Sequence, residues 1–178
     1  NIYFAGETFS TSGIAWNGFQ NSYNGGGDAF LAKFDTSGNR IWGTYYGGTS
    51  NENFENSVTT DNFGNVYISG ETASSSGISS NGFQNNIGGL TDAFLVKFDS
   101  SGNRLWATYY GGTDFDSGIN LCTDVIGNIY LSGWTKSISG ISWGGLQNIY
   151  GGGLYDVYLV KFNSLGMRLW ATYYGGTD

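Results

Sequence analysis

The sequence predicts an all-β chain whose short antiparallel sheets stack as the blades of a β-propeller, and three observations support this fold class. A pattern of about 64 residues occurs three times along the chain. Each copy contains short runs of aromatic and β-branched residues separated by turn residues, which is typical of strands. Residues 93–98 are apolar on both faces, whereas a strand with one solvated face would alternate apolar and polar residues. Such a strand is buried on both sides only when similar sheets lie in front of it and behind it.

The repeated pattern fills the chain, so a single domain of three tandem repeats is expected over residues 1–178, with copies at about 1–64, 65–127 and 128–178. Three segments carry most of the similarity between the copies. They begin at residues 1, 65 and 128, at residues 28, 92 and 156, and at residues 40, 104 and 168. No second domain is needed to account for the sequence.

Each copy is expected to supply four strands in two hairpins, which gives three four-stranded antiparallel blades. In the middle copy the strands are predicted at 57–60, 65–71, 93–98 and 104–110. The turn between the last two strands contains Gly102 at the position where a positive φ is required. The first strand of the pattern occurs only twice, because the sequence opens at the second strand of the first copy.

Three blades are fewer than the ~4–8 that close a propeller ring. They would leave apolar faces and strand edges exposed, which favours association. We therefore expect the chain to form part of a larger ring. The ring would be completed by further blades of the same polypeptide or by assembly of copies, and we favour the first.

The composition argues against several classes of function. The chain has no His, so it cannot build a Ser-His-Asp triad, a Cys-His dyad or a His-ligated zinc site. Its single cysteine, Cys122, cannot form an internal disulfide and is expected to be a small buried residue in a strand. The net charge of −7 opposes binding to nucleic acid or anionic lipid, and no apolar run is long enough to span a membrane. Neither a nucleic-acid partner nor membrane insertion is expected, and no catalytic residue is assigned.

Residues that recur in register are expected to be structural. Six of the seven basic residues recur in this way: Lys33, Lys97, Lys161, Arg40, Arg104 and Arg168. Charges that repeat with the fold are expected to tie turns and strand ends together within each blade. The recurring tryptophans Trp42, Trp106 and Trp170 are expected to lie in the interior.

Four linked segments of the middle copy resemble the bacterial β-propeller repeat known as the SBBP repeat, and the other two copies fit the same pattern. The segments are Gly64–Thr72, Gly82–Gln84, Asp92–Asp99 and Trp106–Gly112. The resemblance implies a propeller in a secreted or surface-exposed bacterial protein, with a structural or interaction role such as adhesion or assembly. The implied partners are other proteins or further blades, and the family brings no catalytic residues. The third copy departs from the pattern at four positions: Trp134, Leu146, Asn163 and Met167.

The long loop between the second and third strands of each copy is the first candidate binding site. Trp16 and Trp143 occupy one position of this loop, where the middle copy has Ser80. An exposed indole can stack on a sugar ring, while side-chain amides bond its hydroxyls. The amides in register are those of Gln20, Gln84 and Gln147. A lectin-like, glycan-binding propeller is therefore the alternative function, and the competing interpretation is that the indoles fold inward and pin the loop.

The loop that leads from one blade to the next is the second candidate, because it is acidic. It contains Glu52, Glu55, Asp114, Asp116 and Asp178. Clustered carboxylates can bind Ca²⁺, but the spacing of Asp114 and Asp116 supplies only the start of a calcium loop. A solvated acidic loop is favoured, and no cofactor is expected. A hydrolase or quinoprotein is a third possibility, although the Asp-x-x-Gly-x-x-x-Trp segment resembles the tryptophan-docked blades of quinoprotein dehydrogenases without any cofactor-binding residues beside it.

Overall fold

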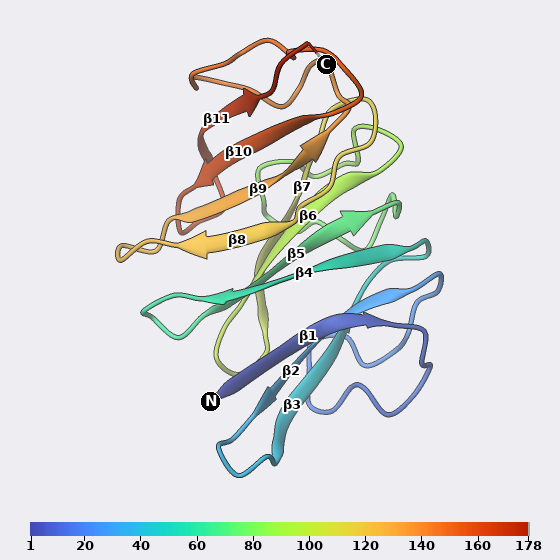
Figure 1. Cartoon of the computed structure of the whole chain (residues 1–178). Helices are drawn as coiled ribbons and strands as arrows, with labels where there is room; N and C mark the ends of the chain where they lie inside the picture. The colour runs from blue at the N-terminus through green and yellow to red at the C-terminus, as the bar shows by residue number, and fades with distance from the viewer. Residues whose placement is uncertain (178) are drawn as a thin grey trace.

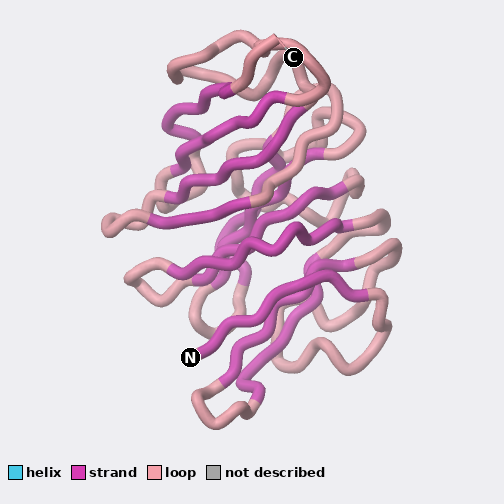
Figure 2. The backbone as a smooth tube through the Cα atoms, viewed as in Figure 1, coloured by secondary structure: helices cyan, strands magenta, loops and turns pink. Residues whose placement is uncertain are grey.

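The computed structural model describes residues 1–177, apart from the side chains of residues 54–56. Within that part the chain forms strands joined by loops and contains no helix, as Figure 2 shows, so no helix there is long enough to cross a membrane. The strands are β1 (Ile2–Thr8), β2 (Asp28–Phe34), β3 (Arg40–Tyr46), β4 (Glu52–Thr60), β5 (Val66–Thr72), β6 (Asp92–Phe98), β7 (Arg104–Tyr110), β8 (Asn120–Thr123), β9 (Ile129–Thr135), β10 (Asp156–Phe162) and β11 (Arg168–Tyr174).

The strands form three antiparallel sheets, which lie one above another from the N-terminal to the C-terminal end of the chain (Figure 1). Sheet 1 has the order β1-β2-β3, sheet 2 the order β4-β5-β6-β7 and sheet 3 the order β8-β9-β10-β11. The all-β, antiparallel prediction is confirmed. Sheet 1 has three strands rather than four, because β4 follows β3 in the chain but pairs with β5 of the next sheet.

The predicted strands agree with the structure at most boundaries. In sheet 2, β5, β6 and β7 begin and end within one residue of the expected positions. β4 is longer than predicted and starts at Glu52, with a register shift between Asn53 and Ser57. The segment expected to be a loop at Glu52 is therefore the start of a strand, because its backbone pairs with Thr72 at the end of β5.

The hairpin turns repeat one chemistry, which the turn between β6 and β7 illustrates. The Asp99 carboxylate accepts hydrogen bonds from the backbone N–H groups of Ser101 at 2.8 Å and Asn103 at 2.9 Å. Gly102 has a φ of +88°, a conformation that residues with a Cβ rarely adopt. The turn is thus tight and fixed by its own side chain.

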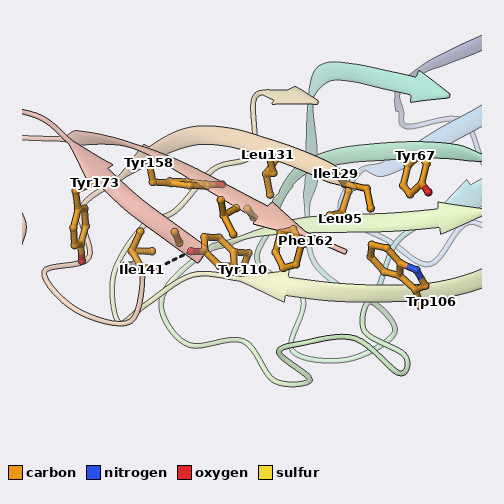
Figure 3. Packing of buried hydrophobic residues seen from close by; sticks show 13 residues of the cluster. Tyr67, Leu95, Trp106, Tyr110, Ile129, Leu131, Ile141, Tyr158, Phe162 and Tyr173 are labelled. Carbon is orange, nitrogen blue, oxygen red and sulfur yellow. Dashed lines mark hydrogen bonds between the residues drawn. The ribbon is translucent and has the colours of Figure 1, made fainter. Parts of the chain in front are cut away.

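Two clusters of buried apolar side chains lie between the sheets, one in each gap. Figure 3 shows the second cluster, in which Leu95 and Tyr110 of sheet 2 pack beside Leu131 and Phe162 of sheet 3. β6 is buried along its whole length, as its two apolar faces predicted. Burial of both faces by neighbouring sheets is the main source of stability in this arrangement.

Each sheet has a forward face, directed at the following sheet, and a rear face, directed at the preceding one. The forward-face positions are buried in sheets 1 and 2 but largely uncovered in sheet 3. Tyr46 and Tyr110 are fully buried, for example, whereas Tyr174 is 72% exposed. The forward-face sets are Ala29, Leu31, Lys33, Trp42 and Tyr46 in sheet 1, Ala93, Leu95, Lys97, Trp106 and Tyr110 in sheet 2, and Val157, Leu159, Lys161, Trp170 and Tyr174 in sheet 3.

On the forward faces of sheets 1 and 2, the tryptophan reaches a turn of the next sheet. The Trp42 indole N–H donates to the carbonyl of Ser100 at 3.2 Å, and the Trp106 indole N–H donates to the carbonyl of Ser164 at 3.1 Å. Trp42 and Trp106 are buried as predicted, at 2% and 5% exposure. The expectation for Trp170 is wrong, because this side chain is only half-buried and no described sheet follows it.

Cys122 lies in β8 as predicted, but the expectation that it is buried is also wrong. It pairs with Tyr130 and therefore lies on the forward face of sheet 3, where no described sheet covers it. The prediction that the recurring basic residues connect groups within one blade holds only in part, because Lys33 and Lys97 also bond the next sheet. Lys97 lies 3.9 Å from the Asp61 carboxylate of its own sheet, and its ammonium group also donates to the Ser164 carbonyl of the next sheet at 3.1 Å.

Candidate functional site

The long loop after the second strand of each repeat lies along the outer edge of its own sheet. In sheet 1 the backbone N–H groups of Trp16 and Gly43 donate to each other's carbonyls, both at 2.8 Å. The same exchange links Trp143 to Ala171 in sheet 3, at 2.9 and 2.8 Å. The loop backbone is thus held against β3 and β11, and the side chain of each tryptophan starts from a fixed position.

Both loop indoles point away from the interior. Trp16 is 56% exposed and Trp143 is 58% exposed, so the interpretation that they fold inward is wrong. Trp16 and Arg40 line a hollow of about 360 Å³. The Arg168 guanidinium lies 5.7 Å from the ring of Trp143, a cation–π contact that leaves the indole accessible.

The loop glutamines are engaged within the protein. The Gln84 amide donates to the Asp92 carboxylate at 2.6 Å and accepts from the Gly111 N–H at 3.1 Å. Gln20 makes the same pair of contacts with Asp28 and Gly47. Gln147 accepts from the Gly175 N–H at 3.3 Å. These amides connect the loop to the ends of neighbouring strands, which is a structural role.

The predicted binding residues do not gather in one place. Trp16 belongs to sheet 1 and Trp143 to sheet 3, with Ser80 of sheet 2 at the equivalent position between them. A glycan site would therefore be local to each loop.

The acidic residues of the second candidate do not form a metal site in the described part of the chain. Asp116 is fully buried and accepts hydrogen bonds from the Gly112 N–H at 2.7 Å and the Ser137 hydroxyl at 2.8 Å. The Asp114 carboxylate instead accepts from the N–H of Phe115 at 2.9 Å. Among the side chains that the structure describes, no three acidic or Cys groups gather in a way that could hold a metal ion. The side chain of Glu55 and the whole of Asp178 lie outside the described residues.

Buried carboxylates occur in pairs where the chain passes from one sheet to the next. A Cβ on Gly47 would clash with a Glu52 oxygen and with an Asp28 oxygen, so the two carboxylates face each other across this glycine. Asp92 and Asp116 flank Gly111 in the same way. Burial raises the pKa of Glu52 from 4.5 to about 7, although hydrogen bonds from Ser74 and Thr72 oppose the shift.

These pairs predict that the fold loses stability as the pH rises. The raised pKa of Glu52 means that the folded chain holds its proton more tightly than the unfolded chain does, so stability falls as the pH rises from 4.5 to about 7. Burial of Asp92, whose pKa rises from 3.8 to about 6, acts in the same direction. Carboxylates with a lowered pKa, such as Asp35 with its hydrogen bond from Asn39, change the stability only at lower pH.

The measurement is the melting temperature across this pH range. We expect a fall towards neutral pH in the parent chain and a smaller fall in the Glu52→Gln variant. A melting temperature of the parent chain that does not change over this pH range would contradict the buried pairing of the carboxylates.

The uncovered faces at the two ends of the stack agree with the expectation that three blades leave apolar faces exposed, but the residues that form these faces were not predicted. On the rear face of sheet 1, Ile2 and Phe4 are 54% and 59% exposed, whereas the matching Val66 and Ile68 of sheet 2 are fully buried. A hollow of about 180 Å³ lies on this rear face. It is lined by Phe4, Gly13, Ile14, Phe30, Ala32, Phe34 and Arg40. The signal that could have found it is the repeat itself, since each copy must present one face to a neighbour on either side.

Comparison with known proteins agrees with this architecture. Residues 41–77 match the family model of the β-propeller repeat SBBP, and no curated protein matches the chain. The matched segment runs from β3 of sheet 1 through β4 and β5 of sheet 2. It therefore contains the crossing between two stacked sheets, which is the unit that the rest of the structure repeats. Residues 41–77 are therefore similar to a β-propeller repeat.

Proposed function

We propose that the chain is a non-catalytic structural and interaction module, built as three propeller blades that form part of a larger ring. The observation that carries this proposal is the burial of successive sheets by face-to-face packing, which leaves one apolar face open at each end of the stack. In this proposal sheets 1 to 3 are the blades. Further blades of the same polypeptide, or partner proteins, cover the open faces, in a secreted or cell-surface bacterial protein with a role in adhesion or assembly.

The distribution of polar groups supports a structural role. The most deeply buried acidic groups, among them Glu52, Asp92 and Asp116, hydrogen-bond to the backbone or to hydroxyls at the crossings between sheets. Their raised pKa values follow from burial at these crossings, and structural networks perturb pKa values as active sites do. A role in catalysis is therefore not proposed for them.

A lectin-like function is the second candidate, because two tryptophans on loops are more than half exposed. An indole offers a flat apolar surface to a sugar ring, and Trp16 lies beside a hollow of about 360 Å³. Against this, the loop glutamines already have partners within the protein.

A glycan array separates the two candidates. We expect no binding by the parent chain. Glycan binding that is lost in both Trp16→Ala and Trp143→Ala, but kept in Trp134→Ala, would replace the proposal by the lectin function. Trp134 is the matched control, because it lies in β9 and not in a long loop.

A further inference from the structure

On the forward faces of sheets 1 and 2, one tyrosine fills a socket in the rear face of the next sheet. The Tyr46 ring packs against Phe94 at 5.6 Å and edge-on against Phe98 at 5.8 Å between ring centroids. Its hydroxyl donates to the Ile78 carbonyl at 2.5 Å, and the Arg104 guanidinium donates to the same carbonyl at 3.3 Å. The socket thus has two aromatic walls, a carbonyl at its base and an arginine beside it.

The same contact occurs at the next interface. Tyr110 packs against Tyr158 at 5.3 Å and Phe162 at 5.6 Å, and its hydroxyl donates to the Ile141 carbonyl at 2.5 Å (Figure 3). Arg168 donates to that carbonyl at 3.2 Å. Two independent interfaces therefore use one arrangement of side chains.

A second contact accompanies the tyrosine at both interfaces. The indole of Trp42 covers Gly102 in the turn of sheet 2, where a Cβ would lie 2.9 Å from the ring. Trp106 covers Gly166 at the same distance in the turn of sheet 3. Each interface is thus a tyrosine in a socket together with an indole on a glycine turn.

Both halves of this contact are open at the ends of the stack. On the forward face of sheet 3, Tyr174 is 72% exposed and Trp170 is half-buried. On the rear face of sheet 1 the hollow of about 180 Å³ has Phe30, Phe34 and Arg40 in its lining, at the positions of Phe94, Phe98 and Arg104. No described atom lies within 4 Å of a Cβ placed on Gly38, the counterpart of Gly102.

We propose that a second copy of this chain docks head-to-tail, with Tyr174 of one copy in the rear-face hollow of the other and Trp170 on the turn at Gly38. The Tyr174 hydroxyl then donates to the carbonyl of Ile14, which already accepts from Arg40 at 2.9 Å. A second copy fits these surfaces because they are the two halves of an interface that the chain already forms twice internally. The inference rests on the proposed stacking function and adds the partner and its contacts.

The first test is sedimentation of the chain over low to high micromolar concentrations, with reductant present because Cys122 is exposed. The parent chain is expected to self-associate as its concentration rises. Tyr174→Ala is expected to weaken this association at least about tenfold, as loss of a central aromatic anchor does. Phe63→Ala is the matched control, since Phe63 is 70% exposed but lies in the turn between β4 and β5.

A second variant blocks the other surface. Gly38 has a φ of +84°, which Asn tolerates better than most residues, so Gly38→Asn fills the docking turn with little cost to the fold. Gly144→Asn is its control, because Asn17 and Asn81 occupy the equivalent position with φ values of +50° and +53°. Gly38→Asn is expected to weaken self-association as Tyr174→Ala does, and Gly144→Asn is expected to leave it unchanged.

Mixing the two blocked variants tests the head-to-tail direction. Tyr174→Ala keeps an intact rear face and Gly38→Asn keeps an intact forward face, so the mixture is expected to form a 1:1 dimer that neither variant forms alone. A parent chain that stays monomeric, or a mixture that does not associate, would overturn the proposal. Neither result depends on the glycan array, so the docking inference and the proposed function fail separately.

Discussion

Replacing Trp106 by alanine is expected to lower the free energy of unfolding by about 3–5 kcal/mol, because it opens a cavity between two sheets. The side chain is 5% exposed and packs against Tyr67 with ring centroids 6.2 Å apart. The substitution also removes the indole N–H that donates a hydrogen bond to the Ser164 carbonyl. A loss of this size is a large share of the stability of a typical domain. Denaturant unfolding followed by circular dichroism measures it.

Trp170→Ala provides the control within the same chain. Trp170 holds the same position in its repeat but is half-buried, so its removal is expected to cost less, about 1–2 kcal/mol. The comparison is made at a protein concentration low enough to keep the chain monomeric. Equal losses of unfolding free energy in the two variants would show that the cost of removing the tryptophan does not depend on the sheet that follows it.

Replacing Gly102 by alanine is expected to cost about 2–5 kcal/mol, which combines two effects. A residue with a Cβ is strained at a φ of +88°, by roughly 1–2 kcal/mol. The new Cβ would also lie 2.9 Å from the Trp42 ring, so the indole must shift, and overpacking of this kind costs about 1–3 kcal/mol.

Gly38→Ala separates the two effects. Gly38 occupies the same turn position in sheet 1, with a φ of +84°, and no described atom lies within 4 Å of its added Cβ. Only the backbone strain remains, so a loss of about 1–2 kcal/mol is expected for the dilute chain. If both variants lose the same free energy of unfolding, the contact between Trp42 and the turn contributes nothing to stability.

Much of the fold could be predicted from the sequence because the repeat supplies three versions of each strand. The two apolar faces of β6 indicated a neighbour on each side, and both neighbours are present. Gly102 marked a turn with positive φ, and it has one. These features depend on local chemistry, so the sequence carries them directly.

The errors arose where the environment depends on position in the stack. Trp170 and Cys122 were expected to be buried because equivalent or neighbouring strands bury apolar residues, but both lie on a face that no described sheet covers. The exposure of Trp16 and Trp143 could not be deduced, because it depends on which way each side chain leaves a loop held to the sheet edge. The partners of the loop glutamines come from strand ends far away in sequence, such as Gly111 for Gln84.

Hydrogen exchange of the indole N–H groups tests the stacking of the sheets most directly, in the Tyr174→Ala chain so that docking of copies does not contribute. Trp42 and Trp106 donate to carbonyls of the following sheet, at 3.2 and 3.1 Å, so their N–H signals are expected to exchange slowly. Trp170 is expected to exchange much faster. Exchange of all three at one rate would contradict the placement of each sheet against its neighbour.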